Sequence, residues 1–313
     1  MDFNEQVVLI TGGSSGIGAA TAIYFANLSA KLVLVGRKEN NLRRIAAYCE
    51  KVKGVKPLTI TADLTEDADV ERIIDETVGH FGKLDVLVNN AGVLKPGGIK
   101  NSNMDNYDTV MSTNVRAVYH LTMRATPHLI ESKGCIVNVS SIASTKPNAL
   151  TIAYNVSKAA LDQFTKCVAL ELAADGVRVN SVNPGFVKTN ILSDTGLSED
   201  QLELVVQNIV NNMPLKKPLQ ADEVAGVIAF LASNKAKSIT GSCFVIDGGS
   251  LLKIRLISMN KNANFIGKDP IFMKVYMYFF LANIPSSYHR HQTIKLDKRT
   301  LEIFFLTSKV VVN

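Results

Sequence analysis

The chain alternates short apolar runs, rich in β-branched residues, with longer stretches of helical periodicity. The first unit is the run Val7–Ile10, then a glycine-rich turn over residues 11–18, then a helical stretch to about Ser29. Three more units follow. In the first a strand at 31–35 precedes a helix to about Val52, in the second a strand at 58–61 precedes a helix over 66–80, and in the third a strand at 86–88 precedes a helix that reaches Pro127. Consecutive strand–helix units predict a parallel sheet.

Three further strands are predicted at 135–139, 177–182 and 243–246, with helices at about 153–174 and 221–232. Strands that are apolar throughout are buried on both faces, as a sheet covered by helices on both sides requires. We therefore predict an α/β fold, a doubly wound (Rossmann) parallel sheet of about seven strands with helices on both faces. This domain is expected to span residues 1–252.

Composition excludes several other classes of protein. With 313 residues, 47% of them hydrophobic and 20% charged, the chain is neither disordered nor fibrous. Its four cysteines (Cys49, Cys135, Cys167 and Cys243) are scattered, with no C-x-x-C pair, and His/Cys/carboxylate clusters are missing. We expect no disulfide framework and no metal site, and we interpret the cysteines as buried thiols in a reducing compartment.

The net charge of +6 is unevenly distributed. Residues 253–313 hold 10 Lys/Arg and 3 Asp/Glu, whereas residues 1–252 hold 24 and 25. Without a basic body the chain is not expected to bind nucleic acid. The apolar stretch 271–284 is too short for a membrane span, and the acidic start of the chain does not resemble a targeting segment. We expect a cytoplasmic protein.

Residues 253–313 form an atypical C-terminal extension without clean periodicity. Three interpretations stay open. The segment could be a poorly ordered appendage, an interaction or membrane-surface element that uses its basic and aromatic residues, or the product of an unusual transcript or gene model.

The turn at residues 11–18 is the first chemical signal. Backbone N–H groups at a helix N-terminus, approached closely through Gly12, Gly16 and Gly18, form a site for a diphosphate. The alternative is that these glycines merely allow a tight connection between strand and helix. The position after the first strand of a βα series favours the diphosphate site.

A second signal follows the strand at residues 31–35. Sites that select NAD usually carry an acid near this point, whereas Gly36 and Arg37 stand here and the first acid is Glu39. Because a guanidinium can bind a ribose phosphate, NADP(H) is favoured over NAD. Alternatively, Arg37 is an ordinary solvated charge at the start of a helix.

A third signal is the pair Tyr154 and Lys158, four residues apart and so on one face of a helix. Transfer of a hydride to a ketone needs a proton donor and a second hydrogen bond at the carbonyl oxygen, which Tyr154 and Ser141 would supply. The Lys158 ammonium and the positive nicotinamide of the oxidised cofactor are expected to depress the pKa of the phenol. Other motif residues occur in order along the chain: Thr11–Gly18, Asp63, Asn89–Gly92, Asn114 and Asn183–Gly185.

Together these motifs resemble the short-chain dehydrogenase/reductase family, in its single-domain branch, over residues 5–252. The sequence as a whole is similar to family members described as 3-oxoacyl-carrier-protein-reductase-like. The resemblance implies that Tyr154 is the general acid/base, that Lys158 activates it, and that Ser141 orients the carbonyl. It implies that Asn114 holds a proton-relay water. Tyr154 and Ser141 would contact substrate.

The resemblance also implies which residues bind the cofactor. Asp63 would bond the adenine, and Asn90 would line the cleft. The full expected set is Thr11, Gly12, Ser14, Ser15, Gly16, Ile17, Gly18, Arg37, Asp63, Leu64, Asn90, Ala91, Gly92, Tyr154, Lys158, Pro184, Gly185, Val187 and Thr189. The family usually has a basic residue where Ser15 stands, so the NADP(H) prediction depends mainly on Arg37.

The implied activity is NADP(H)-dependent hydride transfer to or from a small-molecule carbonyl or secondary alcohol, in a homotetramer or homodimer. The alternative is a catalytically idle dinucleotide-binding or scaffold protein that acts through its tail.

The residues Ser198–Gln201 have the spacing of a capping box, which predicts a helix start. The predicted helix has a stripe of apolar residues: Leu202, Val205, Val206 and Ile209, followed by Met213. This stripe either closes over the cofactor cleft or packs against the rest of the protein without a role in binding. If it faces the cleft, the substrate is apolar: a 3-oxoacyl chain, a steroid-like ketone or a terpenoid.

Overall fold

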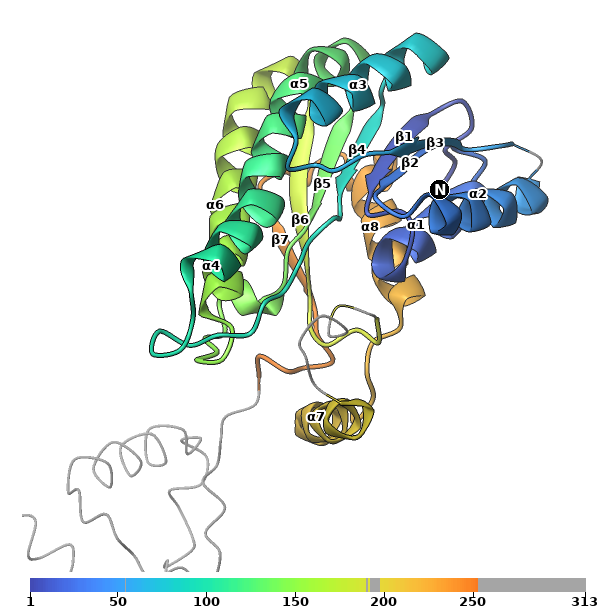
Figure 1. The fold of residues 1–313 in the computed structure, drawn as a ribbon. Helices are drawn as coiled ribbons and strands as arrows, with labels where there is room; N and C mark the ends of the chain where they lie inside the picture. The colour runs from blue at the N-terminus through green and yellow to red at the C-terminus, as the bar shows by residue number, and fades with distance from the viewer. Residues whose placement is uncertain (54, 190, 192–197, 253–313) are drawn as a thin grey trace, which may run out of the picture. The chain divides into compact units, whose positions relative to one another are not determined.

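The computed structural model of the protein describes residues 1–53, 55–189, 191 and 198–252. In these residues seven parallel strands form one sheet in the order β3-β2-β1-β4-β5-β6-β7 (Figure 1). The strands are β1 (Val7–Thr11), β2 (Lys31–Gly36), β3 (Leu58–Thr61), β4 (Val86–Asn89), β5 (Cys135–Val139), β6 (Arg178–Pro184) and β7 (Cys243–Ile246). The strand order reverses between β1 and β4, which places a crevice at the carboxyl ends of these two strands.

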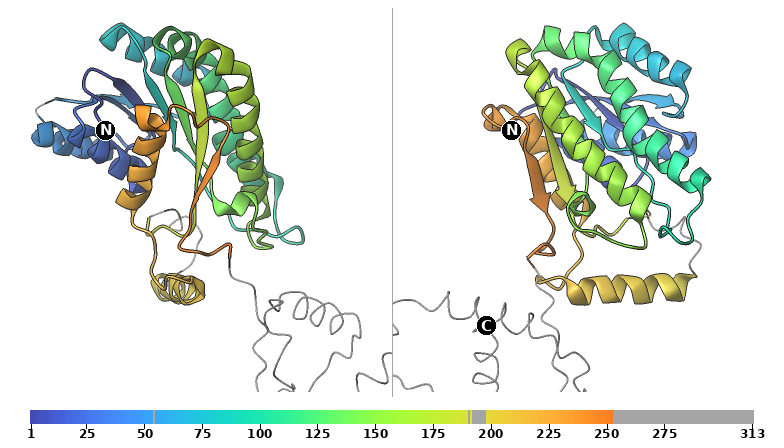
Figure 2. Two further views of the ribbon diagram at one scale, coloured as in Figure 1. Left: turned by 180° about the vertical axis from the view of Figure 1, so that it is seen from behind. Right: turned by 90° about the vertical axis from the view of Figure 1, so that its left-hand side faces the viewer.

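Helices cover both faces of the sheet, as predicted (Figures 1 and 2). One face packs against α1 (Gly16–Asn27), α2 (Glu39–Lys53) and α8 (Ala221–Ala232), and the other against α3 (Asp67–Phe81), α5 (Ala117–Ser132) and α6 (Ile152–Leu172). Successive side chains of a strand point to opposite faces. Accordingly Val8 and Ile10 join the first core, and Val7 and Leu9 join the second.

The register brings the strand ends together at one edge. Ile10 of β1 lies opposite Val88 of β4, and Val139 of β5 lies opposite Val182 of β6. The residues that follow these strands therefore meet at the carboxyl edge of the sheet. The sequence motifs with expected chemistry lie there, on α6 or, in the case of Asn114, in the helical segment before α5.

The prediction of one helix that reaches Pro127 is wrong, because the segment is interrupted and ends later than predicted. The segment consists of α4 (Met104–Met111), a π-helical turn over Ser112–Arg116, and α5, which continues past Pro127 to Ser132. Pro127 is exposed, so the carbonyl left without a partner faces water, while Ala125 and Leu129 are buried and hold the helix on the sheet. Strand β6 also runs beyond the predicted residue 182 to Pro184.

The helix predicted after Ser198 is α7 (Glu199–Asn212), and its capping box forms between Ser198 and Gln201. No residue of α7 is buried, and Figures 1 and 2 show it beyond the carboxyl edge of the sheet, apart from the helices that cover the two faces. The residues of its apolar stripe are partly buried, apart from Val205, which is exposed. Met213, directly after it, is buried.

The prediction that all four cysteines are buried is only partly right. Cys49 and Cys135 are buried, Cys243 is partly exposed, and Cys167 is exposed because it lies on the outer side of α6. All four are free thiols. Within the described residues, none of the helices is long and apolar enough to cross a membrane, and no metal-binding cluster occurs. The extension predicted at 253–313 lies outside the described residues.

Candidate active site

Tyr154 and Lys158 lie in the first two turns of α6, and both side chains are buried against the carboxyl edge of the sheet. The Tyr154 hydroxyl is hydrogen-bonded to the Ser141 side chain. The Lys158 Nζ lies 5.6 Å from the centre of the Tyr154 ring. Helical spacing thus brings the ammonium beside the phenol, and the turn after β5 brings the hydroxyl of Ser141.

The pKa of Tyr154 differs from expectation. Burial raises it to about 12, and the hydrogen bond with Ser141 offsets only part of that rise. In protein without the cofactor the pKa is therefore raised and not depressed, because the buried phenolate loses its hydration. The phenol consequently keeps its proton at neutral pH and can donate it to a developing alkoxide.

The Lys158 ammonium is held by the end of β5. Its Nζ donates to the Val139 carbonyl at 2.8 Å. Burial lowers the pKa of Lys158 to about 8, and the charge of Asp162, one turn further along α6, partly counters this shift. Lysine is thus still mostly charged at neutral pH, but it loses its charge in the mildly alkaline range.

Asn114 lies in the π-helical turn before α5 and is fully buried. Its side chain accepts from the Val93 N–H at 2.8 Å and donates to the Ser157 hydroxyl at 3.0 Å. A Cβ added to Gly92 would lie 3.3 Å from Asn114 Oδ1 and 3.6 Å from Lys158 Nζ. The π turn therefore places Asn114 between the end of β4 and α6, beside Lys158.

The turn after β1 is held against the end of β4 by Thr11. Its hydroxyl accepts from the backbone N–H groups of Asn90 at 2.9 Å and Ala91 at 3.0 Å. In return the Asn90 amide donates to the Thr11 carbonyl at 2.7 Å. A Cβ on Gly18 would lie 2.3 Å from the Gly12 carbonyl oxygen, so this position needs glycine for the helix to approach the turn.

The start of α1 fits a diphosphate. Gly12 and Gly16 have positive φ values of 65° and 53°, and Ser15 at the N-cap makes no side-chain capping bond, so the first N–H groups of the helix are available to an anion. Thr189 borders this turn, because a Cβ on Gly16 would lie 3.2 Å from its Cγ2. Ile17, by contrast, packs partly into the core, and it contributes to packing.

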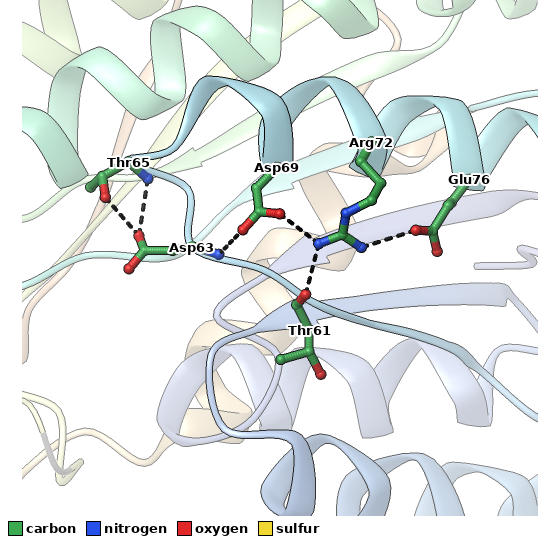
Figure 3. Close-up of polar contacts among 6 residues, drawn as sticks. All are labelled: Thr61, Asp63, Thr65, Asp69, Arg72 and Glu76. Carbon is green, nitrogen blue, oxygen red and sulfur yellow. Dashed lines mark hydrogen bonds and ion pairs between the residues drawn. The ribbon is translucent and has the colours of Figure 1, made fainter.

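Asp63, expected to bond the adenine, is positioned by a network at the end of β3 (Figure 3). Its Oδ1 accepts from both the N–H and the hydroxyl of Thr65, and its own N–H donates to Asp69 at 2.7 Å. Arg72 binds Asp69 and the Thr61 carbonyl (Figure 3). Asp63 Oδ2 lies outside this network, and the neighbouring Leu64 packs partly against the core.

Arg37 follows β2, and its side chain is 68% exposed. Its Nη1 lies 3.9 Å from Asp63 Oδ2, a contact too long and too exposed to hold the guanidinium firmly. Ser14 of the glycine turn is adjacent, since a Cβ on Gly36 would lie 3.3 Å from its hydroxyl. The fold thus places Arg37, Asp63 and Ser14 at the same end of the crevice.

The residues after β6 form the other end of the crevice. The Gly185 N–H donates to the Ile246 carbonyl at 2.8 Å, and a Cβ at this position would lie 2.8 Å from the Asp247 Cα. The Ser141 hydroxyl lies 3.4 Å from the Pro184 carbonyl. Val187 is buried and pairs with Leu219.

Two polar residues of the site, Asp162 and Ser157, were not predicted to take part in it, and Asn183 was predicted as a motif residue without a role. Asp162 and Asn183 form a buried hydrogen bond of 2.7 Å beneath Ser141, and Ser157 binds Asn114. Asp162 and Ser157 are buried on α6, as Lys158 is, and polar residues at buried helix positions are the signal that could have indicated them.

Comparison with known proteins gives matches over most of the chain. The family described as Enoyl-(Acyl carrier protein) reductase matches residues 12–250. A short-chain dehydrogenase/reductase of unknown function from Caenorhabditis elegans, solved with cofactor, is similar at 35% identity and a TM-score of 0.76, covering 81% of this chain and 97% of its own.

Two further solved structures are similar. The 3-ketoacyl-(acyl-carrier-protein) reductase of Brucella melitensis, complexed with NADH, has 32% identity and a TM-score of 0.72 over 80% of this chain and 99% of its own. The L-sorbose reductase of Gluconobacter frateurii, complexed with NADPH and L-sorbose, has 31% identity and a TM-score of 0.75. The match covers 81% of this chain and 99% of the reductase chain.

Proposed function

The chain belongs to the short-chain dehydrogenase/reductase family, and we propose that it uses NADP(H) to reduce an apolar ketone or a 3-oxoacyl chain. As a member of that family it is an oxidoreductase that transfers a hydride between a nicotinamide and a carbonyl or secondary alcohol. The observation that carries the proposal is the meeting of Tyr154, Ser141 and Lys158 at the carboxyl edge of the sheet, beside a glycine turn that fits a diphosphate.

In this proposal the bound nicotinamide supplies the hydride. The Tyr154 phenol gives its proton to the carbonyl oxygen, and the Ser141 hydroxyl donates a second hydrogen bond to that oxygen. Lys158 stabilises the phenolate that results, because its positive charge lies one helical turn away. Asn114 holds the Val93 backbone and Ser157, which keeps the wall beside Lys158 in place for a proton-relay water.

Binding of NADP(H) is supported by the charges at the end of β2. Gly36 has no side chain, Arg37 is exposed, and Glu39 forms an ion pair with Arg43 on α2. A 2′-phosphate here would meet a guanidinium and no competing carboxylate other than Asp63, which lies 3.9 Å from Arg37. A ribose diol would find no side-chain acceptor at residue 36.

The double substitution Gly36→Asp with Arg37→Leu is expected to reverse this preference. Loss of a charged hydrogen bond to phosphate should lower kcat/KM for NADPH by about tenfold to a hundredfold, and the new carboxylate should improve kcat/KM for NADH. Steady-state kinetics with both cofactors measures the ratio. Arg44→Leu, which removes an exposed arginine further along α2, is the control and should leave the ratio unchanged. An unaltered ratio in the double variant contradicts the assignment of Arg37.

An apolar substrate is supported by α7. Leu202, Val206 and Ile209 form a stripe that is only partly buried, on a helix that lies beyond the carboxyl edge of the sheet. In the proposed complex this stripe covers the apolar part of the substrate. The Brucella relative is a 3-ketoacyl reductase, which agrees with this class, whereas the Gluconobacter relative was solved with a sugar.

A ketone panel tests the proposed function. NADPH consumption by the full-length chain is followed with 3-oxoacyl thioesters, steroid-like ketones, terpenoid ketones and L-sorbose. We expect kcat/KM to rise with the apolar surface of the ketone and to be lowest for L-sorbose. A preference for L-sorbose contradicts the apolar substrate, and no consumption with any compound contradicts the proposed activity.

We also propose that copies of this chain assemble as a homodimer or homotetramer in the cytoplasm. The outer sides of α5 and α6 expose Tyr119, Met123 and Leu170, apolar side chains that a second copy would cover. The four free thiols are consistent with a reducing compartment.

A further inference from the structure

A buried carboxylate lies beneath the active site and touches none of the atoms proposed to react. Asp162 follows Lys158 by one turn of α6, and only 7% of its surface is exposed. Two neutral side chains of β6 donate hydrogen bonds to it: Asn183 Nδ2 at 2.7 Å and Ser181 Oγ at 3.4 Å. Burying a carboxylate is costly, so its presence here needs a reason.

Asn183 connects this carboxylate to the turn that carries Ser141. Besides Asp162, its Nδ2 lies 3.3 Å from the Ser141 carbonyl oxygen and 3.2 Å from the Ser144 hydroxyl. Its Oδ1 accepts from Ser181 at 2.7 Å. With both ends of the amide held, one N–H group points at the backbone of the Ser141 turn. The orientation of Ser141 toward Tyr154 therefore depends on how Asn183 is fixed.

The same carboxylate faces Lys158 along the helix. The other titratable or charged groups near it are Lys166 on α6 and the Cys243 thiol on β7, which is hydrogen-bonded to Asp162. Burial, together with the charge of Asp162, raises the pKa of the Cys243 thiol, so it stays protonated and donates. Asp162 is thus the negative charge that balances the buried ammonium of Lys158.

We propose that Asp162 is a positioning residue for the reduction: through Asn183 it holds the Ser141 turn, and its negative charge faces Lys158. It therefore supports both groups that flank Tyr154 without contacting substrate. This inference rests on the proposed reduction of a ketone at this site.

The test compares Asp162→Ala with Asp162→Asn in the full-length chain. Asp162→Ala removes the acceptor for Asn183 and the charge, so kcat should fall by roughly tenfold to a hundredfold, the scale of a slightly misplaced reacting group. NADPH binding should be unchanged, because the glycine turn is untouched. Asp162→Asn restores an acceptor without the charge and should recover part of kcat.

A second readout does not depend on turnover. The titration of Lys158 is followed by NMR in protein with isotope-labelled lysines, and its resonance is identified by its loss in Lys158→Met. The midpoint should move to lower pH in both Asp162 variants, because an opposite charge that favours the ammonium is gone. Thr165→Val is the matched control, since Thr165 is fully buried one turn further along α6 and binds Asn138 instead. It should change stability but neither kcat nor the midpoint.

Wild-type kcat and an unmoved midpoint in folded Asp162→Ala overturn the inference, as does an equal loss of kcat in Thr165→Val. If Asp162→Ala does not fold, Asp162→Asn decides, and an unmoved Lys158 midpoint in that variant overturns the role of the charge. Should wild-type protein reduce no ketone at all, the proposed function fails, whereas the NMR midpoints still test Asp162.

Discussion

Replacing Tyr154 by Phe is expected to lower ketone reduction by about a hundredfold to ten-thousandfold, the contribution of a positioned general acid. The substitution removes one oxygen atom and keeps the buried ring. Burial raises the pKa of Tyr154 to about 12, so wild-type protein holds the phenol proton throughout the neutral range. Single-turnover oxidation of bound NADPH by a ketone measures the effect.

The same variant should bind NADPH and unfold like the wild type. The expected diphosphate site lies at the start of α1, and the ring of Tyr154 fills its cavity in either protein. Tyr48→Phe, which removes a phenol hydroxyl from the exposed side of α2, is the control and should keep full activity. Substantial reduction by Tyr154→Phe would show that another group donates the proton.

Lys158→Met is expected to lower reduction by about a hundredfold or more without lowering the free energy of unfolding. The variant loses the charge that stabilises the phenolate, and it loses the hydrogen bond to Val139. It also removes a buried ammonium whose pKa burial has lowered from 10.5 to about 8. Below pH 8 the native state therefore holds a buried charge, which lowers the free energy of unfolding. Between about pH 8 and 10.5 Lys158 binds more protons in the unfolded chain than in the native state, so the free energy of unfolding rises with pH in this range.

Two measurements check this prediction. The pH profile of kcat/KM for wild-type reduction should fall above about pH 8 as Lys158 loses its charge, and that fall should be absent from the residual activity of Lys158→Met. Thermal unfolding at pH 7 should show an equal or higher melting temperature for the variant. Lys237→Met, at an exposed position before β7, should match the wild type in both. A wild-type rate in Lys158→Met contradicts the role of the ammonium.

The sheet was predictable because its strands are unbroken apolar runs followed by turn signals. Val7–Ile10 with the glycines after it indicates a buried strand and a helix start, and helical spacing alone places Tyr154 beside Lys158. The capping box at Ser198 likewise depends only on neighbouring residues. These features are local, and the structure has each of them.

Features that depend on packing were not predictable. Pro127 ends a helix by local rules, yet α5 continues because Ala125 and Leu129 are buried on either side of it. The π turn that carries Asn114 has no sequence signal. Asp162 and Asn183 lie far apart in sequence, and only the packing of α6 against β6 joins them. The pKa of Tyr154 rises rather than falls for the same reason, because burial of the phenol follows from the fold.

A crystal structure of the full-length chain with NADP⁺ tests the central claim most directly. We expect the diphosphate at the Gly12–Gly18 turn, the 2′-phosphate against Arg37, and the nicotinamide ring facing the Tyr154 hydroxyl with space for one carbonyl group between them. A dinucleotide bound elsewhere, or a nicotinamide turned away from Tyr154, would contradict the proposed active site.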